Sequence, residues 1–314
     1  MTFADTIPRH ADDGWRDALA AIRAGRPGSL PRWNEIFAPL AASRVDEIIV
    51  IGQIGQSLDG RAATATGHSH YINGSDGLDH LHRLRALVDA VVVGVGTAIA
   101  DDPQLTVRRV AGANPARVII DPSGRLPPTA RAFRDDGTRR IVITAATDVD
   151  HGEQHTGSPP PCGEGSGVGV ARSGTSLPQP PAPPPRPSPA RGEGAKGSAS
   201  AEVEQIELDA DHGHIAPAAI LASLAERGFK RILIEGGPGT VARFLEARCL
   251  DRLHVVVAPI ILGGGRSSLD LAPITRCEEA LRPHTTTHVL GEEVLFDCDL
   301  TAQRRPIGQA KKST

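Results

Sequence analysis

Two short apolar runs that each end in glycines constrain the fold of this chain more than any other feature. Residues 91–93 (Val-Val-Val) are followed by Gly-Val-Gly-Thr at 94–97, and residues 232–234 (Ile-Leu-Ile) by Glu-Gly-Gly at 235–237. Continuous apolar strands separated by helices are typical of a mostly parallel sheet with helices on both faces. Such sheets bind ligands at the carboxyl ends of their strands, so we expect both glycine segments to face one ligand.

The rest of the chain, outside one long interruption, alternates in the same way. The periodicity predicts helices at 80–88, 216–227 and 240–248, and strands at 45–52, 90–95, 117–121, 140–144, 231–235 and 254–259. Two late pieces at 287–290 and 294–300 are expected to form an antiparallel edge hairpin. We therefore expect one α/β domain at 45–303. A helical arm at 1–44 precedes it and packs on the core or on a partner, and a flexible tail follows at 304–314.

The interruption is a Pro/Gly-rich segment at about 151–203. Residues 159–189 hold 11 of the chain's 26 prolines and no aromatic residue. Such a segment cannot bury enough apolar surface to offset its conformational entropy, which predicts a disordered insertion. The alternative is that Pro-Pro-Pro-Arg-Pro at 183–187 is a polyproline ligand for a partner.

The composition argues against several classes of partner. A net charge of −3 gives no electrostatic basis for binding nucleic acid or an anionic membrane surface. No apolar run approaches the roughly 20 residues that span a bilayer, and residues 1–13 lack the pattern of a secretory signal. We therefore expect a cytoplasmic protein. The four cysteines are far apart and form no C-x-x-C pair, which speaks against a zinc site.

The glycine segments and two arginines are candidates for holding an anion. A glycine lets a ligand approach the backbone closely, and the N-terminus of the helix after residue 237 offers N–H groups to a phosphate. Arg85 and Arg108 could hold a phosphate through their guanidinium groups, although for Arg85 alone a solvated helix position is the better interpretation. The histidines between residues 68 and 82 lack a carboxylate or cysteine at ligand spacing, so no metal site is predicted.

Together these motifs resemble the reductase domain of the riboflavin-biosynthesis deaminase/reductase family, which has a dihydrofolate-reductase-like fold. The resemblance spans residues 48–265 outside the insertion. The zinc motif of that family's deaminase half is absent, which points to a stand-alone reductase. The matching residues include Ser57-Leu58-Asp59-Gly60-Arg61, Gly67-His68-Ser69, Leu84-Arg85-Ala86, Val93-Gly94-x-Gly96-Thr97, Asp101-Asp102-Pro103-x-Leu105-Thr106-x-Arg108 and Glu235-Gly236-Gly237.

The resemblance implies that NADPH reduces a ribosylaminopyrimidine 5′-phosphate to its ribitylamino counterpart, in a homodimeric enzyme. The hydride would pass from nicotinamide C4 to C1 of the opened ribose. Two alternatives stay open. One is a reductase of a different pterin-like or sugar-nucleotide substrate, and the other is a non-catalytic nucleotide-binding protein that docks through its Pro-rich segment.

The resemblance also implies a role for particular residues. Those at substrate-contacting positions are Ser69, Arg85, Leu105, Arg108 and Glu235. Those at NADP-contacting positions are Gly55, Tyr71, Thr97, Asp101, Gly237, Pro238, Gly239, Thr240 and Arg243. Glu235 or Asp101 is the expected proton-handling group. The chain departs from the family at Gln53, where many members have lysine, and at Tyr71, which replaces a more usual tryptophan.

Overall fold

The structure of the chain, a computed structural model, describes residues 14–24, 26, 31–41, 48–69, 72–146 and 202–307. The chain divides into two units, one made of Met1–Ala146 with Ser200–Thr314 and the other of Thr147–Ala199. All described residues belong to the first unit. The segment predicted as an insertion lies outside the described residues except for positions 202 and 203, so the expectations for it and for the domain boundaries stay predictions.

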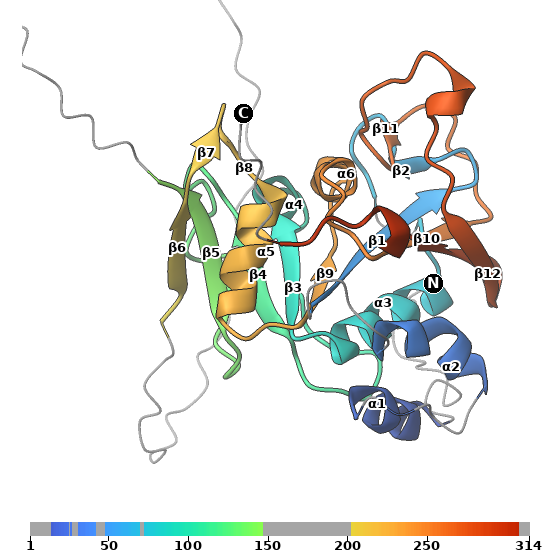
Figure 1. Ribbon diagram of the computed structural model, residues 1–314, viewed down its shortest axis with the longest axis horizontal. Coiled ribbons are helices and arrows are strands. Elements are labelled where there is room, and N and C mark those ends of the chain that lie inside the picture. Colours follow the sequence, from blue (N-terminus) through green and yellow to red (C-terminus); the bar gives the residue numbers. More distant parts are fainter. Residues whose placement is uncertain are drawn as a thin grey trace, which may run out of the picture. The chain divides into compact units, whose positions relative to one another are not determined.

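A mixed sheet forms the centre of the described part (Figure 1). Its nine strands lie in the order β12-β13-β10-β1-β9-β3-β4-β5-β6. Strand β13 pairs antiparallel with both of its neighbours, β12 and β10. All other pairs of the sheet are parallel. The strands are β1 (Ile49–Ser57), β3 (Ala90–Gly94), β4 (Ala116–Ile120), β5 (Arg140–Ala145), β6 (Glu204–Leu208), β9 (Arg231–Ile234), β10 (Arg252–Ala258), β12 (His284–Leu290) and β13 (Glu293–Asp299). Two small antiparallel pairs join β2 (Arg61–Ala63) to β11 (Arg266–Ser267), and β7 (Ala210–Asp211) to β8 (His214–Ile215).

Helices cover both faces of this sheet. Successive residues of one strand point to opposite faces and belong to different apolar clusters, as Val91 and Val92 of β3 do. The cluster on one face includes side chains of α1 (Trp15–Arg23), α2 (Pro31–Phe37), α3 (Ser75–Leu87) and α4 (Val95–Asp101). The cluster on the other face includes side chains of α5 (Pro217–Glu226) and α6 (Pro238–Glu246). The expected fold class is confirmed, including the antiparallel hairpin of β12 and β13 at one edge. Short 3₁₀ turns lie at Ala38–Ala41, Arg131–Phe133, Cys277–Glu279 and Thr301–Gln303.

Some predicted boundaries were wrong for local reasons. The strand expected at 45–52 continues to Ser57, and residues 45–47 of that prediction lie outside the described residues. Gly52 lies inside the strand and does not end it. Its role is packing, because a Cβ at this position would lie 2.9 Å from a side-chain atom of Leu250 and 3.0 Å from one of Leu253. The strand expected at 90–95 ends at Gly94, where the backbone turns into α4.

The edge strand β6 was not predicted. Ile206 is its only buried residue, so the strand shows no apolar run. Polar contacts hold its start instead: Glu204 accepts hydrogen bonds from Arg139 at 2.7 Å and from Arg227 at 2.6 Å. A short, mostly polar strand of this kind is typical of a sheet edge.

The N-terminal helices α1 and α2 pack on the core, one of the two positions expected for the arm. Trp15 contacts Trp33 and Phe37 edge-on, with ring centroids 5.8 and 5.4 Å apart. The guanidinium of Arg83, on α3, lies 4.3 Å from the centroid of the Trp33 ring. Such aromatic and cation–π contacts each add about 0.5–1.5 kcal/mol to the free energy of unfolding, beyond the area they bury.

Candidate active site

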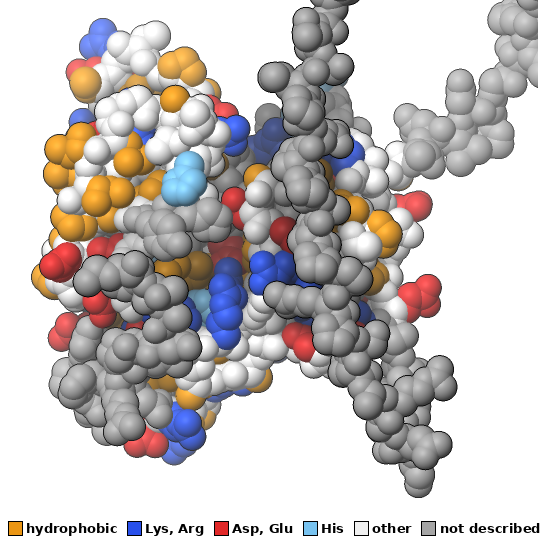
Figure 2. Space-filling model, turned by 180° about the vertical axis from the view of Figure 1, so that it is seen from behind, with side chains coloured by type: hydrophobic (Ala, Val, Ile, Leu, Met, Phe, Trp, Pro, Cys, Tyr) orange, Lys and Arg blue, Asp and Glu red, His pale blue; other side chains and the backbone are white. Residues whose placement is uncertain are grey.

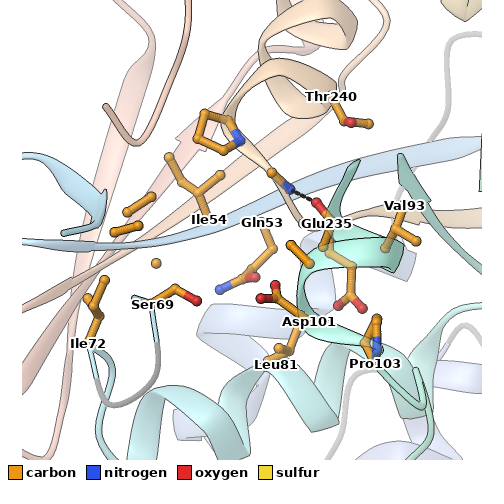
Figure 3. A pocket seen from close by; sticks show the side chains of 18 of the residues that line it. Gln53, Ile54, Ser69, Ile72, Leu81, Val93, Asp101, Pro103, Glu235 and Thr240 are labelled. Carbon is orange, nitrogen blue, oxygen red and sulfur yellow. Dashed lines mark hydrogen bonds between the residues drawn. The ribbon is translucent and has the colours of Figure 1, made fainter. Parts of the chain in front are cut away.

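A cavity of about 550 Å³ lies where β1, β3 and β9 lead into their connecting segments (Figure 3). Its volume falls in the range of small-molecule sites. Most of the residues that the resemblance assigned to substrate or cofactor line it: Gly55, Ser69, Arg85, Thr97, Asp101, Leu105, Glu235, Gly237, Pro238, Gly239, Thr240 and Arg243. The two exceptions are Arg108, which is not among the lining residues, and Tyr71, which lies outside the described residues.

The two glycine segments meet in space, as the sequence predicted. The N–H of Gly237 donates a hydrogen bond to Thr97 Oγ1 at 2.6 Å. A Cβ on Gly94 would lie 2.4 Å from Thr240 Oγ1, so any other residue there would displace the Thr240 hydroxyl. Gly236 has φ +108°, a conformation that residues with a Cβ rarely adopt. These glycines build the junction itself, and with it one wall of the cavity.

Two other glycines of this wall have no such packing role. A Cβ on Gly96 or on Gly239 would meet no atom within 4 Å, and neither residue has a positive φ. Both line the cavity, where the absent side chain leaves the backbone open to a ligand. Gly55 differs, because its Cβ would lie 1.7 Å from Asn73 Oδ1, so any other residue there would displace the Asn73 side chain.

Arg85 and Glu235 form a buried ion pair in the wall of the cavity. Arg85 Nη2 lies 2.6 Å from Glu235 Oε1, and Arg85 Nε lies 3.2 Å from both carboxylate oxygens. Their side chains are only 7% and 4% exposed. The guanidinium also donates to the carbonyl of Thr106 at 3.3 Å. Neither residue is a solvated surface group, and each is the main charged partner of the other.

Asp101 and Gln53 present polar groups to the same cavity (Figure 3). Asp101 is exposed at the end of α4, and no hydrogen bond or ion pair to its side chain is found among the described residues. Gln53 is 7% exposed, and its side chain likewise has no hydrogen-bond partner among the described residues. Both groups are therefore available to a ligand.

Arg108 lies beside the cavity on a loop that also carries Arg109. Its backbone N–H donates to His82 Nδ1 at 3.1 Å, and its side chain is exposed. Although the side chain keeps contact with solvent, partial desolvation, followed by the charges of Arg85, Arg131 and Arg109, lowers the pKa of the Arg108 guanidinium. Arg109 is already paired with Asp79 at 2.6 Å. The guanidinium of Arg108 has no ion pair among the described residues, and such an unpaired cation attracts an anionic ligand.

Sequence reasoning missed Asn73 and Arg266, which also line the cavity. Asn73 Nδ2 donates to Glu293 Oε1 at 2.8 Å, a contact between residues 220 positions apart. No local pattern signals such a contact. Arg266 directly follows Gly263, Gly264 and Gly265, and that glycine run after a predicted strand was a usable signal.

Two of the four histidines between residues 68 and 82, His80 and His82, are buried. His80 Nε2 lies 3.0 Å from His254 Nδ1, and burial lowers the pKa of His80 well below its usual value. Over the described ranges no group of three His, Cys, Asp or Glu side chains could hold a metal ion. In the same part of the chain, no helix is both long and apolar enough to cross a membrane.

Comparisons with known proteins identify the family to which the chain belongs. A family model described as the RibD C-terminal domain matches residues 49–169 and 190–294. The 2,5-diamino-6-ribosylamino-4(3H)-pyrimidinone 5′-phosphate reductase of Methanothermobacter thermautotrophicus is 30% identical over 254 residues, covering 79% of this chain and 96% of that protein. The riboflavin biosynthesis protein RibD of Aquifex aeolicus is 30% identical, covering 77% of this chain but only 54% of that protein. The chain thus spans about half the length of this RibD relative.

Solved structures share the fold. RibD of Acinetobacter baumannii has a TM-score of 0.56 at 23% identity, covering 85% of this chain and 61% of that one. The diaminohydroxyphosphoribosylaminopyrimidine deaminase/5-amino-6-(5-phosphoribosylamino)uracil reductase of Thermotoga maritima has a TM-score of 0.55 at 24% identity, covering 80% and 56%. With most of the chain matched by one family model, the resemblance seen in the sequence is confirmed: the chain belongs to the RibD C-terminal domain family, the reductase family of riboflavin biosynthesis.

Proposed function

We propose that this chain uses NADPH to reduce the ribose of a ribosylaminopyrimidine 5′-phosphate to the open ribityl chain. The observation that carries the proposal is the cavity itself. One wall is an open glycine junction suited to a dinucleotide, and a cationic loop suited to a phosphate lies beside the cavity. The relative from Methanothermobacter thermautotrophicus is named as a reductase of such a pyrimidine phosphate, and the Thermotoga maritima structure as a deaminase and reductase of one.

The residues present fit NADPH. Gly96 and Gly239 leave backbone open at the cavity, and α6 begins there with Pro238 at its first turn. The N-terminus of a helix attracts the negative charge of a pyrophosphate. Thr97, Thr240 and Arg243 would add polar and cationic contacts from the same wall. When bound, NADPH supplies the hydride that reduces C1 of the ribose.

The substrate would lie between this wall and the Arg108 side of the cavity. Arg108 is our candidate for binding a 5′-phosphate on this side, because Arg85 is paired with Glu235 and Arg109 with Asp79, whereas no ion pair of Arg108 is found among the described residues. Ser69 and the buried Leu105 would shape the space around the ribose and the ring. Holding donor and acceptor in line in this way is worth about 7–11 kcal/mol of the reaction barrier.

Asp101 is the better candidate for handling the proton of the reaction. Its carboxylate lines the cavity and is available, whereas Glu235 is occupied by the Arg85 guanidinium. Glu235 would act by holding Arg85 in place, and through it the carbonyl of Thr106 in the loop next to the substrate.

We also propose that the enzyme is a cytoplasmic homodimer. Val289 on β12 is 73% exposed, and Phe296 on the neighbouring β13 is 37% exposed. Hydrophobic side chains gather on one side of the molecule in Figure 2, and exposed apolar groups of this kind are typical of a surface that another protein covers. Sedimentation equilibrium of the wild type and of Val289→Lys checks this, with a monomer expected only for the variant.

The deciding experiment follows NADPH oxidation at 340 nm with two substrates, the 2-amino pyrimidinone phosphate and the corresponding uracil phosphate. Oxidation with either one supports the proposal, and the faster substrate identifies the physiological class. Tight NADPH binding without oxidation of either would point to a different reduced substrate. Absence of NADPH binding would contradict the enzyme proposal and leave the nucleotide-binding alternative to be tested with other nucleotides.

A further inference from the structure

The helical arm makes direct contact with the loop that carries Arg108. We call residues 102–115 the Arg108 loop. Trp15 Nε1, on α1, donates a hydrogen bond to the carbonyl of Ala111 at 2.7 Å. Val107, Val110 and Ala111 of this loop pack against the apolar cluster that contains Trp15. The arm therefore reaches the loop three residues beyond Arg108, and it does so from outside the cavity.

The same loop rests on α3 at a point where the arm also holds α3. A Cβ on Gly112 would lie 2.4 Å from the Cβ of Ala86, so the glycine lets the loop lie directly on this helix. Arg23 of α1 donates to the carbonyl of Ala86 at 2.6 Å. One helix thus fixes both the loop and the turn of α3 beneath it.

From these contacts we infer that α1 is a positioning element for the substrate phosphate, acting through the Trp15 indole and the backbone of the Arg108 loop. The inference rests on the proposed sugar-phosphate substrate. It goes beyond the family, because α1 and α2 precede residue 49, where the match to the family model begins. The two hydrogen bonds of α1 described above go to the carbonyls of Ala111 and Ala86, which lie on the side of the Arg108 loop, so we expect the main effect there.

If α1 acts on the phosphate side, a change in α1 should affect some kinetic constants and leave others unchanged. If the Arg108 loop leaves its bound position part of the time, the apparent affinity for the phosphate falls by the fraction of competent loop. Loss of the single Trp15 hydrogen bond would lower the equilibrium constant for the bound loop position by about threefold to tenfold. The KM for the pyrimidine phosphate rises by up to this factor, while kcat and the affinity for NADPH stay nearly unchanged.

Trp15→Phe tests the inference, since it keeps an aromatic ring in the cluster and removes the indole donor together with part of the ring volume. Trp33→Phe is the matched control, because it makes the same change in the neighbouring ring on α2. Both variants are expected to lower the thermal midpoint, but only Trp15→Phe should raise the KM. Equal KM values for Trp15→Phe and the wild type would overturn the inference, and so would equal increases in the two variants.

A second measurement does not depend on the stability of Trp15→Phe. The chain has only two tryptophans, so Trp33→Phe leaves Trp15 as the sole reporter on the loop. Titration with ribose 5-phosphate should change its emission in a saturable way, and Arg108→Ala in the same background should abolish the change. No change with bound sugar phosphate refutes the coupling. If the wild type neither binds the sugar phosphate nor oxidises NADPH, the proposed function has failed instead.

Discussion

The buried pair of Arg85 and Glu235 allows a sharp test of what Arg85 does. Both side chains are less than a tenth exposed and lie 2.6 Å apart. Removing one partner leaves the other as an uncompensated buried charge, which costs about 3–5 kcal/mol of the free energy of unfolding. We expect this loss for Arg85→Met and for Glu235→Gln. For a domain of this size, it corresponds to a decrease of roughly 6–20 °C in the thermal midpoint.

A double-mutant cycle with urea unfolding measures the coupling. The Arg85→Met/Glu235→Gln double variant should be less destabilised than the sum of the single variants, by about 2–3 kcal/mol. Arg276→Met is the control, since Arg276 and Glu278 are paired at 3.2 Å but are 72% and 73% exposed, and it should cost less than about 1 kcal/mol. A small stability loss in Arg85→Met together with a large rise in substrate KM would refute the reasoning. Arg85 would then be a phosphate ligand that turns away from Glu235 when substrate binds.

Three further predictions concern the cavity and its surroundings. Arg108→Ala should raise the substrate KM by about 10–150-fold, the equivalent of a charge-assisted hydrogen bond of about 1.5–3 kcal/mol; isothermal titration should show unchanged NADPH affinity, and equal loss of both would contradict its assignment. Gly239→Ala should raise the thermal midpoint slightly, because alanine favours a helix by about 0.5–1 kcal/mol, yet weaken NADPH binding; unchanged binding would show that the cofactor does not approach this backbone. Burial, with the charges of Arg85, Arg108 and Arg109, lowers the pKa of His82 from 6.5 to about 3. The unfolded chain therefore binds the extra proton, and stability should fall as the pH decreases from about 6.5 towards 3, by up to about 1.4 kcal/mol per unit; His82→Gln should flatten this slope in urea titrations, and parallel slopes would disprove it.

The fold was predictable where the local pattern and the tertiary structure agree. The apolar runs identify β3, β4 and β9 as buried strands, because their residues pack on one face or the other of a covered sheet. The leucine spacing identifies α3 as a helix that packs on one of these faces. Strand β6 could not be found in this way, since only Ile206 is buried and its ion pairs depend on Arg139 and Arg227 from distant segments. Gly52 read as a strand end, but it is a point of close packing.

The sequence predicted most of the residues that line the candidate site, but fewer of the contacts between them. The glycine segments were expected to meet, and the Gly237–Thr97 hydrogen bond joins them. The partner of Arg85 could not be inferred from the sequence, because Glu235 lies 150 residues away and no periodicity relates the two. For the same reason a solvated helix surface was the better interpretation of Arg85 taken alone, and that interpretation is wrong.

The position of β9 between β1 and β3 affects how the protein is made. The main-sheet neighbours of β1 are β9 and β10, and both are encoded more than 170 residues after β1 begins. While the first half of the chain leaves the ribosome, this apolar strand has neither of its neighbours, a state that favours aggregation. The two halves are interleaved in one sheet once folded, so a protease cut between β5 and β6 would leave two fragments that stay associated. Co-expressed fragments should therefore reassemble into one enzyme.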